Sequence, residues 1–167
     1  NPDTAKQGAW LASHPVPASY ASVNYWAIHA FTLNNAKGSA QIVKFKAVPS
    51  AGEAGLTDDE VKAKAPDFYV SELKERLAKG PASFDLAAII GEAGDPADDP
   101  TTMWPEDARK TINLGTIAIS ATEPEASCDA VTFDPANLAE GITGPANDPI
   151  FAVRSSAYAM SLTRRSN

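Results

Sequence analysis

Four stretches rich in apolar, β-branched and aromatic residues predict β-strands. The first two cover residues 24–33 and 40–48. The residues between them, 34–38, have the sequence Asn-Asn-Ala-Lys-Gly, and such residues tolerate a positive φ, so we expect a hairpin. Residues 83–90 and 111–119 are the other two predicted strands, the second with an alternation of apolar and polar positions.

Helical spacing and end signals predict three helices. Thr57 and Glu60 have the spacing of a capping box, so a helix should begin there. Pro66 separates it from a second helix, whose apolar residues recur at helical spacing from Phe68 until the Gly-Pro pair at 80–81. A third helix is expected from Ile150 to about Arg165.

The order of these elements predicts an α+β fold with an antiparallel sheet. Residues 123–149 are dense in Pro, Gly, Asp and Asn and should form an extended loop over the surface. No repeat or linker divides the 167 residues, which suit one domain or a piece of a larger one. Because the sequence begins with Asn1 and not Met, we expect that residues upstream have been removed or left out.

Charge and composition narrow the possible partners. A net charge of −7, from 14 basic and 21 acidic residues, has the wrong sign for a nucleic-acid partner. No segment approaches the roughly 20 apolar residues of a membrane span. Cys128 is the single cysteine and there are two histidines, so neither an internal disulfide nor a zinc cluster is expected.

The terminal helix carries the residues with the clearest chemical potential. Arg154 lies one turn before Tyr158, with Ser161 and Arg165 following on the same narrow face. A nearby cation favours the phenolate form of a tyrosine, the form that ligates a metal. The same spacing occurs by chance in many helices, so on spacing alone a surface arginine beside a half-buried tyrosine is the favoured interpretation.

Two other candidates have plain structural interpretations. His29, inside a predicted strand, is either a core histidine hydrogen-bonded to backbone or a functional residue. The acidic residues Asp95, Asp98 and Asp99 lack the spacing and the glycine of a calcium loop, so no metal site is expected there.

Four segments, in order along the chain, resemble the C-terminal half of the monofunctional heme catalase domain, most closely the small catalase-related peroxidases of bacteria. The first is Tyr-Trp-Ala-Ile-His-Ala-Phe at 25–31, followed by the 34–38 turn. The second is Asp-Pro-Thr-Thr-Met-Trp-Pro at 99–105, and the third is Phe-Asp-Pro-Ala-Asn-Leu-Ala-Glu-Gly-Ile at 133–142. The fourth runs from 148 to 165. After Tyr158 the sequence departs from the Asp-Thr-His-Arg pattern of large catalases.

The resemblance implies a fold, a cofactor and a set of site residues. The fold would be part of the catalase-type antiparallel β-barrel, with a helix pair and a C-terminal heme-proximal helix. The cofactor would be heme b, with Tyr158 as the axial ligand of its iron. Arg154 would hydrogen-bond the phenolate, and His29 and Asp148 would complete a relay behind it. A heme propionate would be bound by Arg165, or by its neighbour Arg164.

The function implied is heme-dependent decomposition of hydrogen peroxide, or peroxidase activity with an organic electron donor. Residues 1–167 would be the heme-proximal portion of a single catalase-like domain. The distal histidine and its partners lie upstream of this sequence in the family, so we expect a complementary N-terminal half-chain. The alternatives are a heme-binding module or a non-catalytic fragment without peroxide turnover. A homo-oligomer is possible, and a periplasmic location is favoured over a cytoplasmic one.

Overall fold

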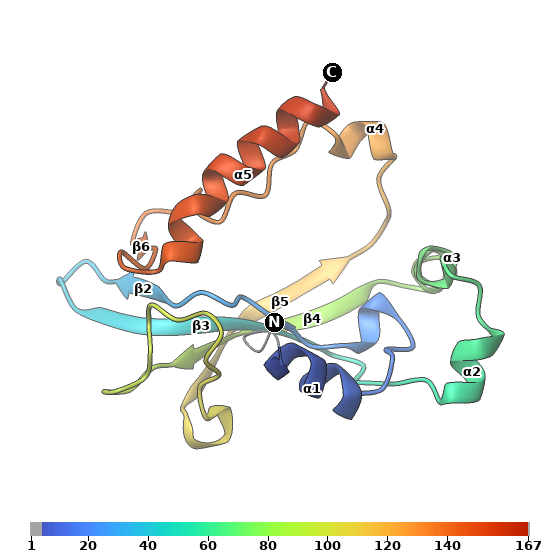
Figure 1. Ribbon diagram of the computed structural model, residues 1–167, viewed down its shortest axis with the longest axis horizontal. Coiled ribbons are helices and arrows are strands. Elements are labelled where there is room, and N and C mark those ends of the chain that lie inside the picture. Colours follow the sequence, from blue (N-terminus) through green and yellow to red (C-terminus); the bar gives the residue numbers. More distant parts are fainter. Residues whose placement is uncertain (1–4, 167) are drawn as a thin grey trace. The chain divides into compact units, whose positions relative to one another are not determined.

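The computed structural model describes residues 5–166 (Figure 1). The chain divides into two compact units. The first comprises Asn1–Asn24, Val48–Asp85 and Thr116–Ala121, and the second comprises Tyr25–Ala47, Leu86–Gly115 and Thr122–Asn167. Each unit is described by itself below.

The strands form one sheet in the order β5-β4-β3-β2-β6, with β1 also paired to β3. Their bounds are β1 Tyr25–Trp26, β2 Phe31–Asn34, β3 Ala40–Pro49, β4 Ala82–Ile90, β5 Thr111–Ile119 and β6 Ile142–Thr143. The pairs β1–β3, β2–β3 and β2–β6 are antiparallel. Hydrogen bonds from Ser50 N to Ser83 O and from Gly91 N to Ile42 O give β3 and β4 the same relation. The prediction of an α+β fold with an antiparallel sheet is therefore confirmed.

The first predicted strand, 24–33, is wrong in one respect, because it is interrupted at residues 27–30. Tyr25 lies opposite Ala47, whereas Phe31 lies opposite Val43. Trp26 lies opposite Lys46, so the four residues 27–30 face only the two residues 44–45 of β3. The interruption therefore contains two residues more than the stretch of β3 that faces it. Such an insertion releases its residues from the ladder. His29 lies in this segment and not within a strand.

The predicted helices are present. They are α2 (Asp58–Ala63), α3 (Phe68–Leu77) and α5 (Pro149–Arg165). At the start of α2, the Thr57 hydroxyl accepts from the Glu60 N–H and the Glu60 carboxylate accepts from the Thr57 N–H, as the capping-box spacing predicts. α5 begins with proline at its first position, where a missing N–H costs nothing.

Several short elements were not predicted. They are α1 (Ala5–Ser13), α4 (Glu125–Cys128) and the single-turn 3-10 helices η2 (Tyr20–Ser22) and η3 (Glu106–Ala108). The region 123–149, expected to be one extended loop, contains α4 and β6. Strand β6 pairs with β2, which gives this connection a fixed place beside the sheet within the second unit (Figure 1).

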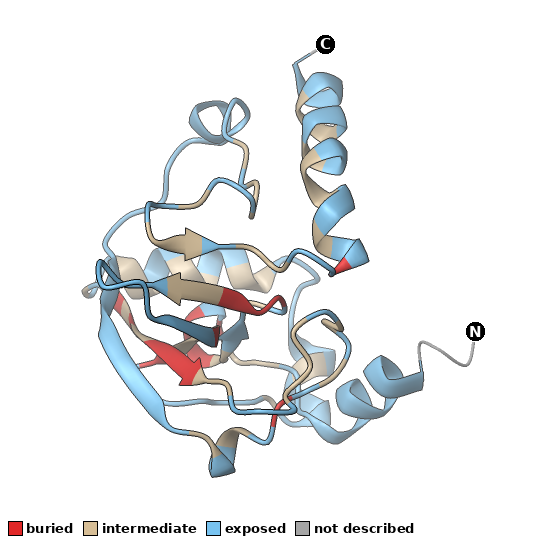
Figure 2. Ribbon diagram, turned by 90° about the vertical axis from the view of Figure 1, so that its left-hand side faces the viewer, coloured by how far each residue is buried: buried red, intermediate tan, exposed pale blue. Residues whose placement is uncertain are grey.

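Buried residues of the second unit lie mostly on strands β2, β3 and β4 and on the segment just before β2 (Figure 2). Phe31, Val43 and Ala88 form one cluster, against which Phe151 from the first turn of α5 packs. A second cluster joins Ala30 and Ile89 to Trp104 of the predicted Trp-Pro motif. No residue of α5 is buried.

Strand β5 is exposed along its whole length in this chain. Its large apolar residues are Ile112, Leu114, Ile117 and Ile119, between 37% and 48% exposed. The predicted alternation shifts by one position between Leu114 and Ile117. Gly115, with a φ of +143°, marks the step. β5 is also the end strand of the sheet, and no described strand pairs with its outer edge.

Candidate functional site

Four of the residues selected from the sequence lie in one hydrogen-bonded chain within the second unit. His29 Nδ1 is 2.6 Å from Asp148 Oδ2, and His29 Nε2 is 3.1 Å from Arg154 Nη1. Arg154 Nη2 donates to the Tyr158 hydroxyl oxygen at 2.5 Å. Residues separated by up to 129 positions in the sequence thus meet as Asp–His–Arg–Tyr.

Asp148 connects this series of hydrogen-bonded side chains to the start of α5. Its Oδ1 accepts hydrogen bonds from the N–H groups of Ile150 and Phe151, at 2.8 and 3.0 Å, which is the side-chain cap that a helix start requires. Its Oδ2 faces His29. The side chain is only 1% exposed. Burial alone would raise the pKa of Asp148, but hydrogen bonds from the Phe151 N–H and from His29 outweigh it and hold the pKa below its usual value.

His29 has side-chain partners on both ring nitrogens and is 2% exposed. A guanidinium can only donate, so Nε2 must accept from Arg154. The proton therefore belongs on Nδ1, where Asp148 accepts it. The ring also packs edge-on against Phe151, at 5.1 Å between centroids. The alternative interpretation, a core histidine bonded to backbone, does not describe this environment.

Arg154 and Tyr158 are half-buried and lie one turn apart on α5. The guanidinium carbon lies 5.3 Å from the centroid of the Tyr158 ring. Because His29 holds one side of the guanidinium, the other side is directed at the phenol oxygen. A surface arginine that met the tyrosine by chance would have no such second partner. The geometry therefore favours an arginine that is held in place by His29 to donate to Tyr158.

The two arginines at the end of α5 have different surroundings. Arg165 donates to the backbone oxygens of Asp129 and Val131, at 3.3 and 3.2 Å, and to the Ser161 hydroxyl at 2.6 Å. Three of its five N–H groups are used in this way, and two remain for an anion. Arg164 makes no hydrogen bond or ion pair with the part of the chain that the structure describes. The predicted role of either in binding a propionate stays a prediction.

A further contact to α5 was missed by the sequence analysis. Asp134 Oδ1 accepts from the Ser155 hydroxyl and from the Ala136 N–H, both at 2.9 Å. The bond to Ala136, two residues on, is an Asx turn, which an Asp-Pro sequence signals. The bond to Ser155 crosses 21 positions, and no local pattern could have indicated it.

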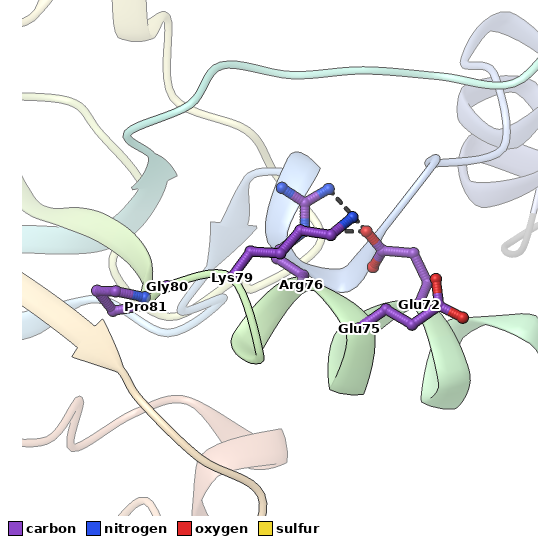
Figure 3. Close-up of a pocket in the computed structure, with 6 residues that line it drawn as sticks. All are labelled: Glu72, Glu75, Arg76, Lys79, Gly80 and Pro81. Atoms are coloured by element: carbon purple, nitrogen blue, oxygen red, sulfur yellow. Dashed lines mark hydrogen bonds and ion pairs between the residues drawn. The ribbon is translucent and has the colours of Figure 1, made fainter.

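The acidic run and a cavity beside α3 do not include the predicted site residues. Asp95 of the acidic run pairs with Arg109, 2.7 Å away, and no group of metal-ligating side chains occurs among residues 5–166. A cavity of about 360 Å³ in the first unit lies beside α3 (Figure 3). The ion pair of Glu72 and Arg76, at 2.7 Å, lies on its wall, and none of the predicted site residues lines it. No described helix has the length and apolar character to cross a membrane.

Comparisons with known proteins connect these observations to a family. A family model described as Catalase matches residues 1–166. The chain is 37% identical over 166 residues to a catalase-related peroxidase of Synechococcus elongatus, covering 98% of this chain and 48% of that protein. It is also 37% identical over 152 residues to a catalase-related peroxidase of Mycolicibacterium paratuberculosis, covering 90% of this chain and 48% of that protein. The chain thus spans about half the length of these relatives.

Solved structures agree on the fold. A bacterial catalase aligns with a TM-score of 0.83 at 21% identity, covering 98% of this chain and 34% of the other. A fungal catalase aligns with a TM-score of 0.77 at 22% identity, covering 89% and 32%. These likenesses show a shared fold, and the family match over residues 1–166 shows that the chain belongs to the catalase family.

Proposed function

We propose that this chain supplies the heme-binding side of an enzyme that decomposes hydrogen peroxide or uses it as a peroxidase. The observation that carries the proposal is the Asp148–His29–Arg154–Tyr158 chain, which directs a guanidinium at a phenol oxygen. Members of the catalase family typically bind heme. A tyrosine oxygen is one of the axial ligands that proteins offer to heme iron.

The residues of α5 fit such a cofactor. Arg154 is the one donor to the Tyr158 hydroxyl oxygen among the described residues, and the oxygen keeps a lone pair for a metal. Ile150, which is 47% exposed, lies one turn before Arg154 on the same side of the helix. A flat apolar ring would cover such a side chain, and Arg164 or the free donors of Arg165 could bind its carboxylates.

In the proposed mechanism, heme b supplies an iron centre that exchanges electrons with peroxide. The residues of this chain control the group that holds the iron. Arg154 stabilises negative charge on the Tyr158 oxygen, because its donor remains within hydrogen-bond distance when the phenol proton leaves. His29 fixes the orientation of that donor, and Asp148 fixes the tautomer of His29.

We propose that residues 1–167 are the heme-proximal portion of a single domain, completed by an N-terminal portion that carries the acid and base for cleaving the O–O bond. Two observations support this. The chain covers about half of its relatives, and β5 presents apolar side chains and an outer edge that no strand within residues 5–166 pairs with. An Ile117→Lys variant should then weaken association of the two portions, whereas Val70→Lys is a matched control at an exposed apolar site of α3.

A visible absorption spectrum of the purified full-length protein tests the heme proposal, followed by oxygen release on adding peroxide. We expect a ferric tyrosinate spectrum in the parent protein and its loss in Tyr158→Phe. Tyr20→Phe, at a tyrosine of the first unit, is the matched control and should keep the spectrum. Full heme affinity in Tyr158→Phe would contradict the assignment of the ligand.

The same measurement separates the competing functions. A tyrosinate spectrum without peroxide consumption would favour a heme-binding module. Oxygen release indicates catalase activity, whereas consumption of peroxide only with an added organic donor indicates peroxidase activity. The compartment and the oligomeric state stay predictions, for which cell fractionation and light scattering are the tests.

A further inference from the structure

We infer that Asp134 and Ser155 form a positioning pair that sets the rotation of α5 about its own axis, and with it the place of the Tyr158 oxygen. The inference rests on the proposed function of Tyr158 as a heme ligand. Neither residue touches the Arg–Tyr contact. Their effect would be exerted through the helix backbone.

The acceptor of this pair, the Asp134 carboxylate, is oriented by a hydrogen bond within its own loop. Asp134 Oδ1 accepts from the Ala136 N–H at 2.9 Å, which closes a turn within the loop and orients the carboxylate. The same oxygen accepts from the Ser155 hydroxyl at 2.9 Å. Both side chains are half-buried, so water competes only partly for the contact. A hydrogen bond to a charged acceptor in such a place is stronger than one between neutral groups.

Apart from Phe151 in its first turn, which packs against the core cluster, α5 depends on polar contacts because none of its residues is buried. Its cap Asp148 binds His29, the adjacent residues Arg154 and Ser155 bind His29 and Asp134 in two different directions, and Arg165 binds the backbone of residues 129 and 131 at the end. Removing the Asp134–Ser155 contact leaves the centre of the helix held by Arg154 alone.

Ser155 matters because of the direction in which it points from the axis of α5, relative to Arg154 and Tyr158. At about 100° per residue, Ser155 lies about 100° around the axis from Arg154, and Tyr158 lies about 40° from it. The tyrosine therefore lies between two anchored directions, one held by His29 and the other by Asp134. An oxygen roughly 8 Å from the axis moves about 1.4 Å when the helix turns by about 10°. Displacements of about 1 Å are enough to impair a ligand or catalytic contact.

The test compares removal of either partner with its conservative replacement, in the full-length protein. Asp134→Ala and Ser155→Ala should each weaken ferric heme binding about tenfold and shift the tyrosinate absorption bands. Asp134→Asn and Ser155→Thr keep an acceptor and a hydroxyl, so they should restore most of the affinity. The matched control is Ser156→Ala, the same change at the next, exposed position of α5.

A second measurement does not require heme. Amide hydrogen exchange across residues 154–159 should quicken in Asp134→Ala and Ser155→Ala and stay at the parent rate in Ser156→Ala. Ser155→Ala should add nothing in an Asp134→Ala background, because the hydrogen bond between the two side chains is already lost there. Should Asp134→Ala fail to fold, Ser155→Ala carries the test, since it leaves the turn at 134–136 intact.

The outcomes separate this inference from the proposed function. Parental heme affinity and exchange in both alanine variants would overturn the positioning pair while the heme assignment stands. Additive effects in the double variant would also overturn it. If the parent protein bound no heme, the proposed function would fail, and the exchange rates alone would support or overturn the pair.

Discussion

Replacing Asp148 by asparagine should destabilise the protein although it changes a single atom type. In the parent, Oδ1 accepts from two backbone N–H groups and Oδ2 accepts from His29. An asparagine has one accepting and one donating side. If its oxygen caps the helix, its NH₂ group faces the His29 Nδ1–H. If His29 changes tautomer in response, its Nε2–H faces an N–H of Arg154. Turning the amide over sets the NH₂ group against the helix N–H groups instead.

Every arrangement of Asp148→Asn therefore contains at least one conflict between two donors. At 1% exposure no water relieves it, and an unsatisfied buried group costs about 1–3 kcal/mol in the free energy of unfolding. Asp148→Ala should cost about 3 kcal/mol, the sum of a cap worth about 1 kcal/mol and a charged hydrogen bond worth about 2 kcal/mol.

Denaturant unfolding of the full-length protein measures these values. The matched control is Asp67→Asn, because Asp67 is an exposed residue at the start of α3 that makes no side-chain cap. Since the folded pKa of Asp148 lies below its unfolded value, its contribution is present at neutral pH and is lost as the pH falls through the folded pKa. Asp148→Asn should remove that pH dependence. An Asp148→Asn protein within about 0.5 kcal/mol of the parent would refute the reasoning.

Three further changes test other contacts. Hydrogen bonds from Arg109 lower the pKa of Asp95 to about 2. The ion pair should therefore add at most about 2 kcal/mol to the free energy of unfolding above pH 4, and this contribution should disappear between pH 4 and 2. Arg109→Gln should flatten that part of a plot of unfolding free energy against pH. Gly91→Ala should cost about 1–3 kcal/mol in denaturant unfolding, because the new Cβ would lie 2.8 Å from the buried Trp104 ring. Thr57→Ala should cost about 1 kcal/mol by the same assay, through loss of the capping box of α2.

Controls for these variants are available in the same chain. Gly8→Ala adds a methyl group with nothing within 4 Å and should not destabilise α1. Asp67→Ala removes a helix-start side chain that makes no cap and should leave stability near the parent value. Parental stability in Gly91→Ala, or equal losses in Thr57→Ala and Asp67→Ala, would show that the stated contacts are not the cause.

The elements predicted correctly are those whose signals are local. The capping box at Thr57 and the periodicity that follows Phe68 need no tertiary partner, and both helices begin where expected. Strands 40–48 and 111–119 were likewise placed within a residue or two. The break at 27–30 could not be predicted in this way, because it follows from the register against β3, which depends on contacts between segments distant in sequence.

The candidate site was predicted only in part from residue chemistry. A spacing of four between Arg154 and Tyr158 occurs in many helices, so the resemblance to the family and not the spacing selected them. That resemblance also pointed to His29 and Asp148, and the structure brings all four together. It gave no indication of Ser155, because a serine on a helix surface has no distinguishing local pattern.

The two-residue register offset between β1 and β2 has a consequence for insertions and deletions. Removing two residues from 27–30 would let one uninterrupted ladder form against β3, a change that local stability would tolerate or even favour. The imidazole would then lie within a strand, on a face set by the pleat, and would lose its place between Asp148 and Arg154. The number of residues from Trp26 to Phe31 is therefore as much a part of the site as any side chain, and a homologue with a shorter segment there should be suspected of having lost the relay even where all four of its residues survive.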